Sequence, residues 1–94
     1  MPILIKHRCM LVHDLHPSLI VNNGLLRVVS ETKEKITLKL LDKEGRITKS
    51  LTTLLEGNGI QDLFLNLSDL NSGTYILNTF CGGRFLKSIK FIKS

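Results

Sequence analysis

The stretch 73-GTYILNTFCGGRFLKSIKFIK-93 decides the predicted fold, because two apolar runs flank a pair of glycines. Between residues 73 and 81, apolar side chains alternate on both parities, which indicates a strand covered on both faces. The glycines at 82–83 supply the positive φ angles that a tight hairpin turn needs. The second run, 84–93, fits helical spacing too, but its β-branched and aromatic residues favour a strand. We therefore predict a terminal β-hairpin, with an amphipathic terminal helix as the alternative.

Turn residues recur at short intervals in the rest of the chain. Gly, Asn and Asp gather at 22–24, 42–45, 57–59 and 71–73. The segments between them are about 8–14 residues long, which is typical of a β-sandwich or barrel and too short for βαβ units. Alternating apolar residues indicate strands within these segments. We predict one all-β domain, with further strands at 26–28, 36–40, 47–51 and 63–67, beside the hairpin strand that includes 75–80.

The N-terminal part of the chain has a different composition. Residues 1–17 hold all three histidines, both prolines and one of the two cysteines. Short strands are expected at 3–5 and 10–13, and the stretch 14–18 is interpreted as a lead-in or linker. We therefore divide the chain into an N-terminal strand or linker, 1–14, and a β-domain, 15–94.

The net charge of +5 and the sequence pI near 9.5 predict a partner that carries negative charge. A positive surface attracts nucleic acid, anionic glycolipid and acidic protein patches alike. A binder of single-stranded nucleic acid also needs aromatic residues among its cations, and Phe85 and Phe91 are better explained as core residues. We predict no nucleic-acid partner. No run approaches about 18 apolar residues, and the cationic residues 6–8 interrupt the N-terminal apolar run, so neither a membrane span nor a signal peptide is expected.

Catalytic and metal chemistry find little support in the residue pattern. His7, Cys9, His13 and His16 are residue types that bind zinc, but their spacing matches no compact zinc module. No histidine follows position 16, so no local pattern pairs Cys81 with a base. We expect two inert buried thiols rather than a disulfide between the cysteines. The sequence therefore predicts no enzyme, no metal site and no cofactor.

Three short blocks occur in order toward the C-terminus. The first is 41-LDKEGR-46, the second is 67-LSDLNSGTY-75, and the third is the glycine pair 82–83 with the apolar and basic ending that follows. In this order, they resemble the C-terminal sorting domain (type A) of cargo proteins of the type IX secretion system. The resemblance covers residues 15–94. The sequence departs from the family at 15-LHPS-18, where the family usually has Y-P-N-P.

The resemblance implies a fold and a function. Such domains are Ig-like antiparallel β-sandwiches of about seven strands. They are address labels that the outer-membrane translocon and its shuttle proteins recognise, and a surface protease with sortase-like activity then removes them. This implies a route from the periplasm to the outer membrane and the cell surface as part of a longer exported cargo. The implied partner-binding residues are Gly45, Arg46, Gly73, Tyr75, Lys87, Lys90 and Lys93.

Two further interpretations remain open from the sequence. A β-sandwich also serves as an adhesive or carbohydrate-binding module, because a fold does not decide a function. An exposed terminal strand also invites pairing between two copies, so a homodimer through edge strands stays open beside a monomer. On a strand, Lys87 and Lys93 fall on one face and Lys90 on the other, so the terminal lysines do not form one stripe.

Overall fold

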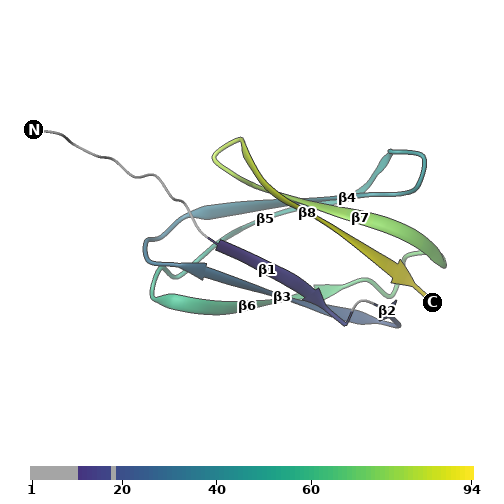
Figure 1. Cartoon of the computed structure of the whole chain (residues 1–94), viewed down its shortest axis with the longest axis horizontal. Coiled ribbons are helices and arrows are strands. Elements are labelled where there is room, and N and C mark those ends of the chain that lie inside the picture. The colour runs from purple at the N-terminus through teal and green to yellow at the C-terminus, as the bar shows by residue number, and fades with distance from the viewer. Residues whose placement is uncertain (1–10, 18) are drawn as a thin grey trace, which may run out of the picture.

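A computed structural model of the chain describes residues 11–17 and 19–94. This part of the chain forms eight strands and no helix (Figure 1). The strands make two sheets, which confirms the predicted all-β sandwich, with eight strands where about seven were expected. Their bounds are β1 (Leu11–His16), β2 (Leu19–Ile20), β3 (Asn23–Ser30), β4 (Lys35–Leu41), β5 (Ile47–Leu54), β6 (Gly59–Asn66), β7 (Gly73–Cys81) and β8 (Arg84–Lys93).

The two sheets are unequal. A three-stranded sheet, in the order β1-β3-β6, faces a five-stranded sheet, in the order β2-β8-β7-β4-β5. Neighbouring strands are antiparallel, except that the short β2 pairs in parallel with the end of β8. In a constant-type Ig domain, the fourth strand joins the sheet of the first, second and fifth. Here β5 instead extends the opposite sheet beside β4, so that five strands face three.

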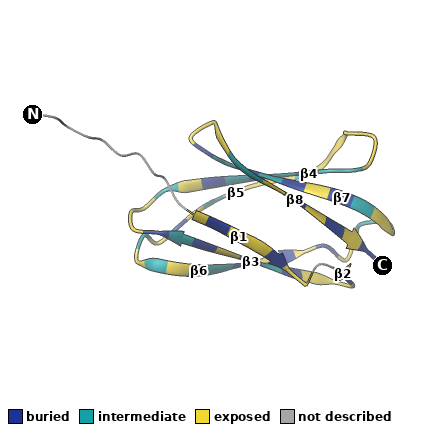
Figure 2. Cartoon of the chain, viewed as in Figure 1, coloured by how far each residue is buried: buried dark blue, intermediate teal, exposed yellow. Residues whose placement is uncertain are grey.

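Alternation places one side of most strands in the core, whereas no residue of β5 is buried (Figure 2). On β4, Ile36, Leu38 and Leu40 are buried, whereas the residues between them face outward. On β7, the outward Ile76 and Phe80 remain partly exposed, so the expectation that this strand is covered on both faces is wrong. The side chains that are completely or almost completely buried are Phe91, Ile20, Leu26, Ile36, Leu55, Leu67, Leu77, Val28 and Thr79.

The terminal hairpin forms as predicted. β7 ends at Cys81 and β8 begins at Arg84, with positive φ angles of 58° at Gly82 and 81° at Gly83. The terminal segment is therefore a strand, and the helical alternative is wrong. Its helix-like spacing arises from a β-bulge in the pairing with β7, between Thr79 and Phe80. At this bulge β8 has one residue more than β7, between Phe85 and Lys87. Phe85 therefore faces outward, although simple alternation from the buried Ile89 would turn it inward.

Tyr75 connects the loop before β7 to the core. Its hydroxyl donates a hydrogen bond of 2.7 Å to the backbone oxygen of Asn71, four residues upstream. Its ring is buried and stacks on Phe91, with centroids 5.6 Å apart. A tyrosine in this place, at the start of the strand after the fifth Ig strand, forms the tyrosine corner of Ig-like sandwiches. The second sequence block therefore has a direct role in the fold.

The N-terminal boundary differs from the prediction. β1 runs from Leu11 to His16, so the lead-in expected at 14–18 is wrong for Asp14 to His16. The pairing of β1 with β3 is irregular between Val12 and Leu15, and both of these side chains are buried. The expected boundary after Asp14 falls inside this strand. The strand expected at 3–5 lies outside the described residues.

Candidate functional site

Two of the three sequence blocks meet at one end of the sandwich. The β4–β5 turn carries the first block, and the loop from β6 into β7 carries the second. Together they line a shallow polar hollow of about 330 Å³. The C-terminal end of β8 lies at the same end, because Lys93 pairs with Gly73. The residues that line the hollow are Asp42, Lys43, Glu44, Arg46, Asn71, Ser72, Gly73, Thr74 and Tyr75.

Asp42 organises the β4–β5 turn. Its Oδ1 accepts hydrogen bonds from the backbone N–H groups of Glu44, at 2.9 Å, and Arg46, at 3.0 Å. The backbone of Gly45 donates to the Asp42 carbonyl at 2.9 Å, with a positive φ of 84° at Gly45. Asx-type bonds of this kind fix a turn through the side chain of its first residue. This explains why the first block needs an aspartate and a glycine at these positions.

The Arg46 side chain is one of the exposed charges of this turn, beside Lys43 and Glu44. Its Nε lies 3.2 Å from Asp42 Oδ2, and a terminal guanidinium nitrogen lies 3.4 Å from Glu44 Oε1. The side chain is nevertheless 75% exposed. The pKa of Asp42 is lowered, first by the backbone hydrogen bond from Arg46, and also by that from Glu44 and by the Arg46 charge. The turn therefore presents a guanidinium at a fixed place beside two carboxylates.

The terminal lysines are divided between two faces of β8, as their spacing predicts. Lys93 points inward and is only 7% exposed, and its Nζ donates to the backbone oxygen of Ser94 at 3.2 Å. Lys87 also belongs to the inner face, and its Nζ lies 3.1 Å from Asp14 Oδ1 on β1. Lys90 is exposed on the outer face. The three lysines do not form a common surface.

The structure describes only some of the candidate metal and thiol residues. His13 and His16 are exposed on β1, whereas His7 and Cys9 lie outside the described residues. Cys81 is buried, and its Sγ lies 3.8 Å from a carboxylate oxygen of Glu34. Within residues 11–17 and 19–94, no three potential metal ligands form a cluster.

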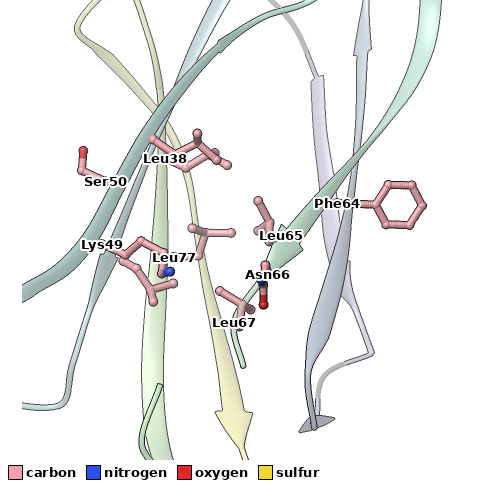
Figure 3. Close-up of a pocket in the computed structure, with 10 residues that line it drawn as sticks. Leu38, Lys49, Ser50, Phe64, Leu65, Asn66, Leu67 and Leu77 are labelled. Carbon is pink, nitrogen blue, oxygen red and sulfur yellow. The ribbon is translucent and has the colours of Figure 1, made fainter. Parts of the chain in front are cut away.

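An apolar groove between β5 and β6 was missed by sequence reasoning. Its volume is about 230 Å³, and it opens along the side of the sandwich where five strands face three (Figure 3). Leu51 on β5 is 42% exposed, whereas Leu38, its neighbour on β4, is 3% exposed. The inner face of β5 is thus uncovered. The groove is lined by Leu38, Leu40, Lys49, Ser50, Leu51, Phe64, Leu65, Asn66, Leu67 and Leu77, and the Phe64 ring points away from it.

The β6 side of this groove is a free sheet edge. Leu67 donates a backbone hydrogen bond of 2.8 Å to Asn22, and the β3–β6 register continues from this pair without a bulge. Because antiparallel ladders alternate, the backbone groups of Leu63 and Leu65 also face β3, and those of Asp62 and Phe64 face outward. This edge can hold an extended segment by strand addition. Alternation in the sequence predicts the strand, but which strands lie at an edge depends on the sheet order.

Among the described residues, no helix is long and apolar enough to cross a membrane. Comparison of the chain with known protein families and with curated proteins finds no match to either.

Proposed function

We propose that this domain is a C-terminal sorting domain of the type IX secretion system, which works by being recognised rather than by catalysis. The observation that carries the proposal is the convergence of two sequence blocks and the C-terminal strand at one end of the sandwich. The first two blocks are separated by twenty residues of sequence, and the strand that closes the third block ends beside them, although its glycine pair lies at the opposite end. A recognition surface needs its elements side by side, and this end of the domain fulfils that condition.

The geometry of this end suits recognition as a folded unit. Asp42 fixes the turn, and Tyr75 fixes the neighbouring loop through its bond to Asn71. A partner that binds such a surface orders few groups, so little conformational entropy opposes binding. The backbone shape of this end depends on Gly45, Gly73 and Tyr75. Arg46 is one of the charged side chains that it exposes. Lys93 supports it from inside the sandwich.

On this proposal, the partners are the outer-membrane translocon and its shuttle proteins, followed by a surface protease with sortase-like activity. The domain would then accompany a cargo from the periplasm to the outer membrane and the cell surface. We call the end of the sandwich that carries the β4–β5 turn and the loop before β7 the motif end. Lys87 and Lys90 belong to the terminal strand but lie away from the motif end, so we assign them no direct role in this contact.

The test is delivery of a reporter. The whole chain is fused behind an exported fluorescent protein in a bacterium that has the type IX system, and surface fluorescence is measured. We expect delivery with the wild-type domain and loss of delivery in a strain without the translocon. Retention of the wild-type fusion in the periplasm, beside delivery by a typical domain of the family, would contradict the proposal.

A matched pair of variants locates the contact. Arg46→Ala removes the exposed guanidinium of the motif end, and Arg84→Ala removes an exposed arginine in the hairpin at the opposite end. We expect Arg46→Ala to reduce delivery and Arg84→Ala to leave it unchanged. Circular dichroism of both purified variants verifies that the β-fold is kept.

A further inference from the structure

The outer face of the five-stranded sheet carries lysines without carboxylates. Alternation places Lys35 and Lys39 of β4 on this face, and Lys90 of β8 lies on it two strands away. The Asp and Glu residues of the described chain lie in loops or turns, on β1, or on the three-stranded sheet. We call the outward surface around these three residues the lysine face.

The lysine face contributes to the positive charge of the folded part. Residues 11–94 hold eleven Lys and Arg and all eight Asp and Glu, which leaves an excess of three positive charges. Elsewhere in the described chain, ion pairs join Arg27 with Asp62, Lys49 with Asp69, Lys87 with Asp14, and Arg46 with Asp42 and Glu44. The three lysines of the lysine face form no such pair within residues 11–17 and 19–94. Four further cations, Lys33, Lys43, Arg84 and Lys93, also form no ion pair among the described residues, but they lie in loops, at the terminal hairpin or inside the sandwich. The lysine face is therefore a sheet surface with three unpaired cations and no carboxylate.

Apolar side chains lie among these lysines. Ile76, opposite Lys90, is 37% exposed, and Phe85 is 54% exposed. Phe85 contacts Phe80 edge to face at 5.8 Å, and Lys39 Nζ lies 5.2 Å from the centre of the Phe80 ring. Aromatic residues are enriched at protein–protein interfaces, where a polar rim surrounds an apolar centre. They give little to a highly charged polysaccharide or a nucleic-acid backbone.

Four of the polar side chains of the same face are already bonded in pairs. The hydroxyls of Thr37 and Thr52 are 3.0 Å apart, and Ser88 donates to Asn78 at 2.7 Å. These cross-strand pairs use groups that would otherwise bond to sugars or bases. The face therefore offers positive charge and apolar contact rather than a set of free hydrogen-bonding groups.

We infer that the lysine face is a second contact surface of the sorting domain and binds an acidic, partly apolar protein surface. The inference rests on the proposed function, and it assigns the acidic surface to a protein of the export route. Complementary charge speeds encounter and fixes orientation, and it discriminates against wrong partners. This surface is distinct from the motif end, because it lies on the flat of the sheet rather than at its turns.

Charge reversal on the reporter fusion tests the inference. Lys90→Glu places a negative charge on the lysine face, and Lys33→Glu makes the same change in the β3–β4 loop. We expect Lys90→Glu to reduce delivery and the double variant Lys39→Glu with Lys90→Glu to abolish it. The control Lys33→Glu should preserve delivery. Delivery of the double variant at the wild-type level overturns the inference but leaves the proposed function intact, whereas failure of the wild-type fusion overturns the proposed function itself.

A titration distinguishes the class of partner. The purified chain is titrated at physiological salt with a heparin oligosaccharide and with an oligothymidine, and amide shifts are followed by NMR. We expect neither polymer to shift the residues of the lysine face selectively. Selective amide shifts that disappear in the Lys39→Glu and Lys90→Glu double variant would contradict an acidic protein as the partner. They would show instead that the lysine face binds the polymer that caused them, a polysaccharide or a nucleic acid.

Discussion

Gly57 is held in a place where a side chain cannot fit. Its φ is +82°, and a Cβ there would lie 2.5 Å from the backbone of Thr32 and Lys33. Gly45 has almost the same φ, +84°, but a Cβ there would meet nothing within 4 Å. A side chain at Gly45 would cost only backbone strain, whereas a side chain at Gly57 would also clash with the neighbouring loop.

We expect Gly57→Ala to lower the free energy of unfolding by roughly 3 kcal/mol or more, and Gly45→Ala by only about 1 kcal/mol. The difference arises because the β3–β4 loop must move away from the new methyl group at position 57. Urea unfolding monitored by circular dichroism measures both values. Equal losses in the two variants would show that the loop yields freely.

Tyr75 makes two separable contributions to stability. Tyr75→Phe keeps the ring on Phe91 and removes the hydroxyl that bonds to Asn71. We expect a loss of about 1 kcal/mol from this change, and of roughly 3 kcal/mol from Tyr75→Ala, which also removes the buried ring. Phe85→Ala is the control, since Phe85 is half exposed, and it should cost clearly less than Tyr75→Ala. A cost near zero for Tyr75→Ala in urea unfolding would contradict the packed role of the tyrosine.

At the scale of elements, the five-over-three arrangement has a direct energetic consequence. Leu38 and Leu51 are opposite each other on β4 and β5, but only Leu38 is covered by the other sheet. We expect Leu38→Ala to cost about 2–5 kcal/mol of unfolding free energy and Leu51→Ala less than about 1 kcal/mol. Chemical denaturation of the two variants measures the difference. Similar costs at both positions would mean that the groove is closed in solution.

The sequence predicts best those elements that depend on a local sequence pattern, such as a turn or an alternation of apolar residues. The β7–β8 hairpin is fixed by its two glycines, and β4 by strict alternation from Ile36 to Leu40. β1 was bounded wrongly, because its irregular pairing with β3 between Val12 and Leu15 breaks the alternation of apolar residues. The pairing of β4 with β5 follows from the short turn between them, but the order of the remaining strands across the two sheets is set by non-local pairing.

The candidate site shows the same division. The Asp42–Arg46 turn was visible in the sequence, because a turn motif is local. That Tyr75 bonds to Asn71 follows from the tertiary path of the chain. The burial of Lys93 was missed, because a lysine at the end of a chain is normally solvated and only the contact of its strand with β2 and β7 covers it. A homodimer through edge strands stays an open alternative.

At the scale of the whole molecule, three aspartates connect stability to pH. Hydrogen bonds and charge from Arg27 and Lys49 lower the pKa of Asp62 and of Asp69, and bonds in the β4–β5 turn lower that of Asp42. A carboxyl group whose pKa is lower in the folded state stabilises the fold above its unfolded pKa of about 3.9, and this contribution is lost as the pH falls through the folded value.

We therefore expect the urea midpoint to be constant above about pH 5 and to fall below about pH 4. Asp62→Asn should reduce this dependence, because it removes one of the three titrations. Urea unfolding between pH 2 and 7 measures both curves. The same midpoint at pH 3 and pH 7 would contradict the assignment.

The uncovered inner face of β5 stands beside a sheet edge that its own sequence does not protect. β6 is an edge strand of the three-stranded sheet, and it has neither a proline nor a lysine to block pairing with another strand. The groove that Leu51 helps to line runs beside this edge, so an added strand would gain apolar contact as well as backbone hydrogen bonds.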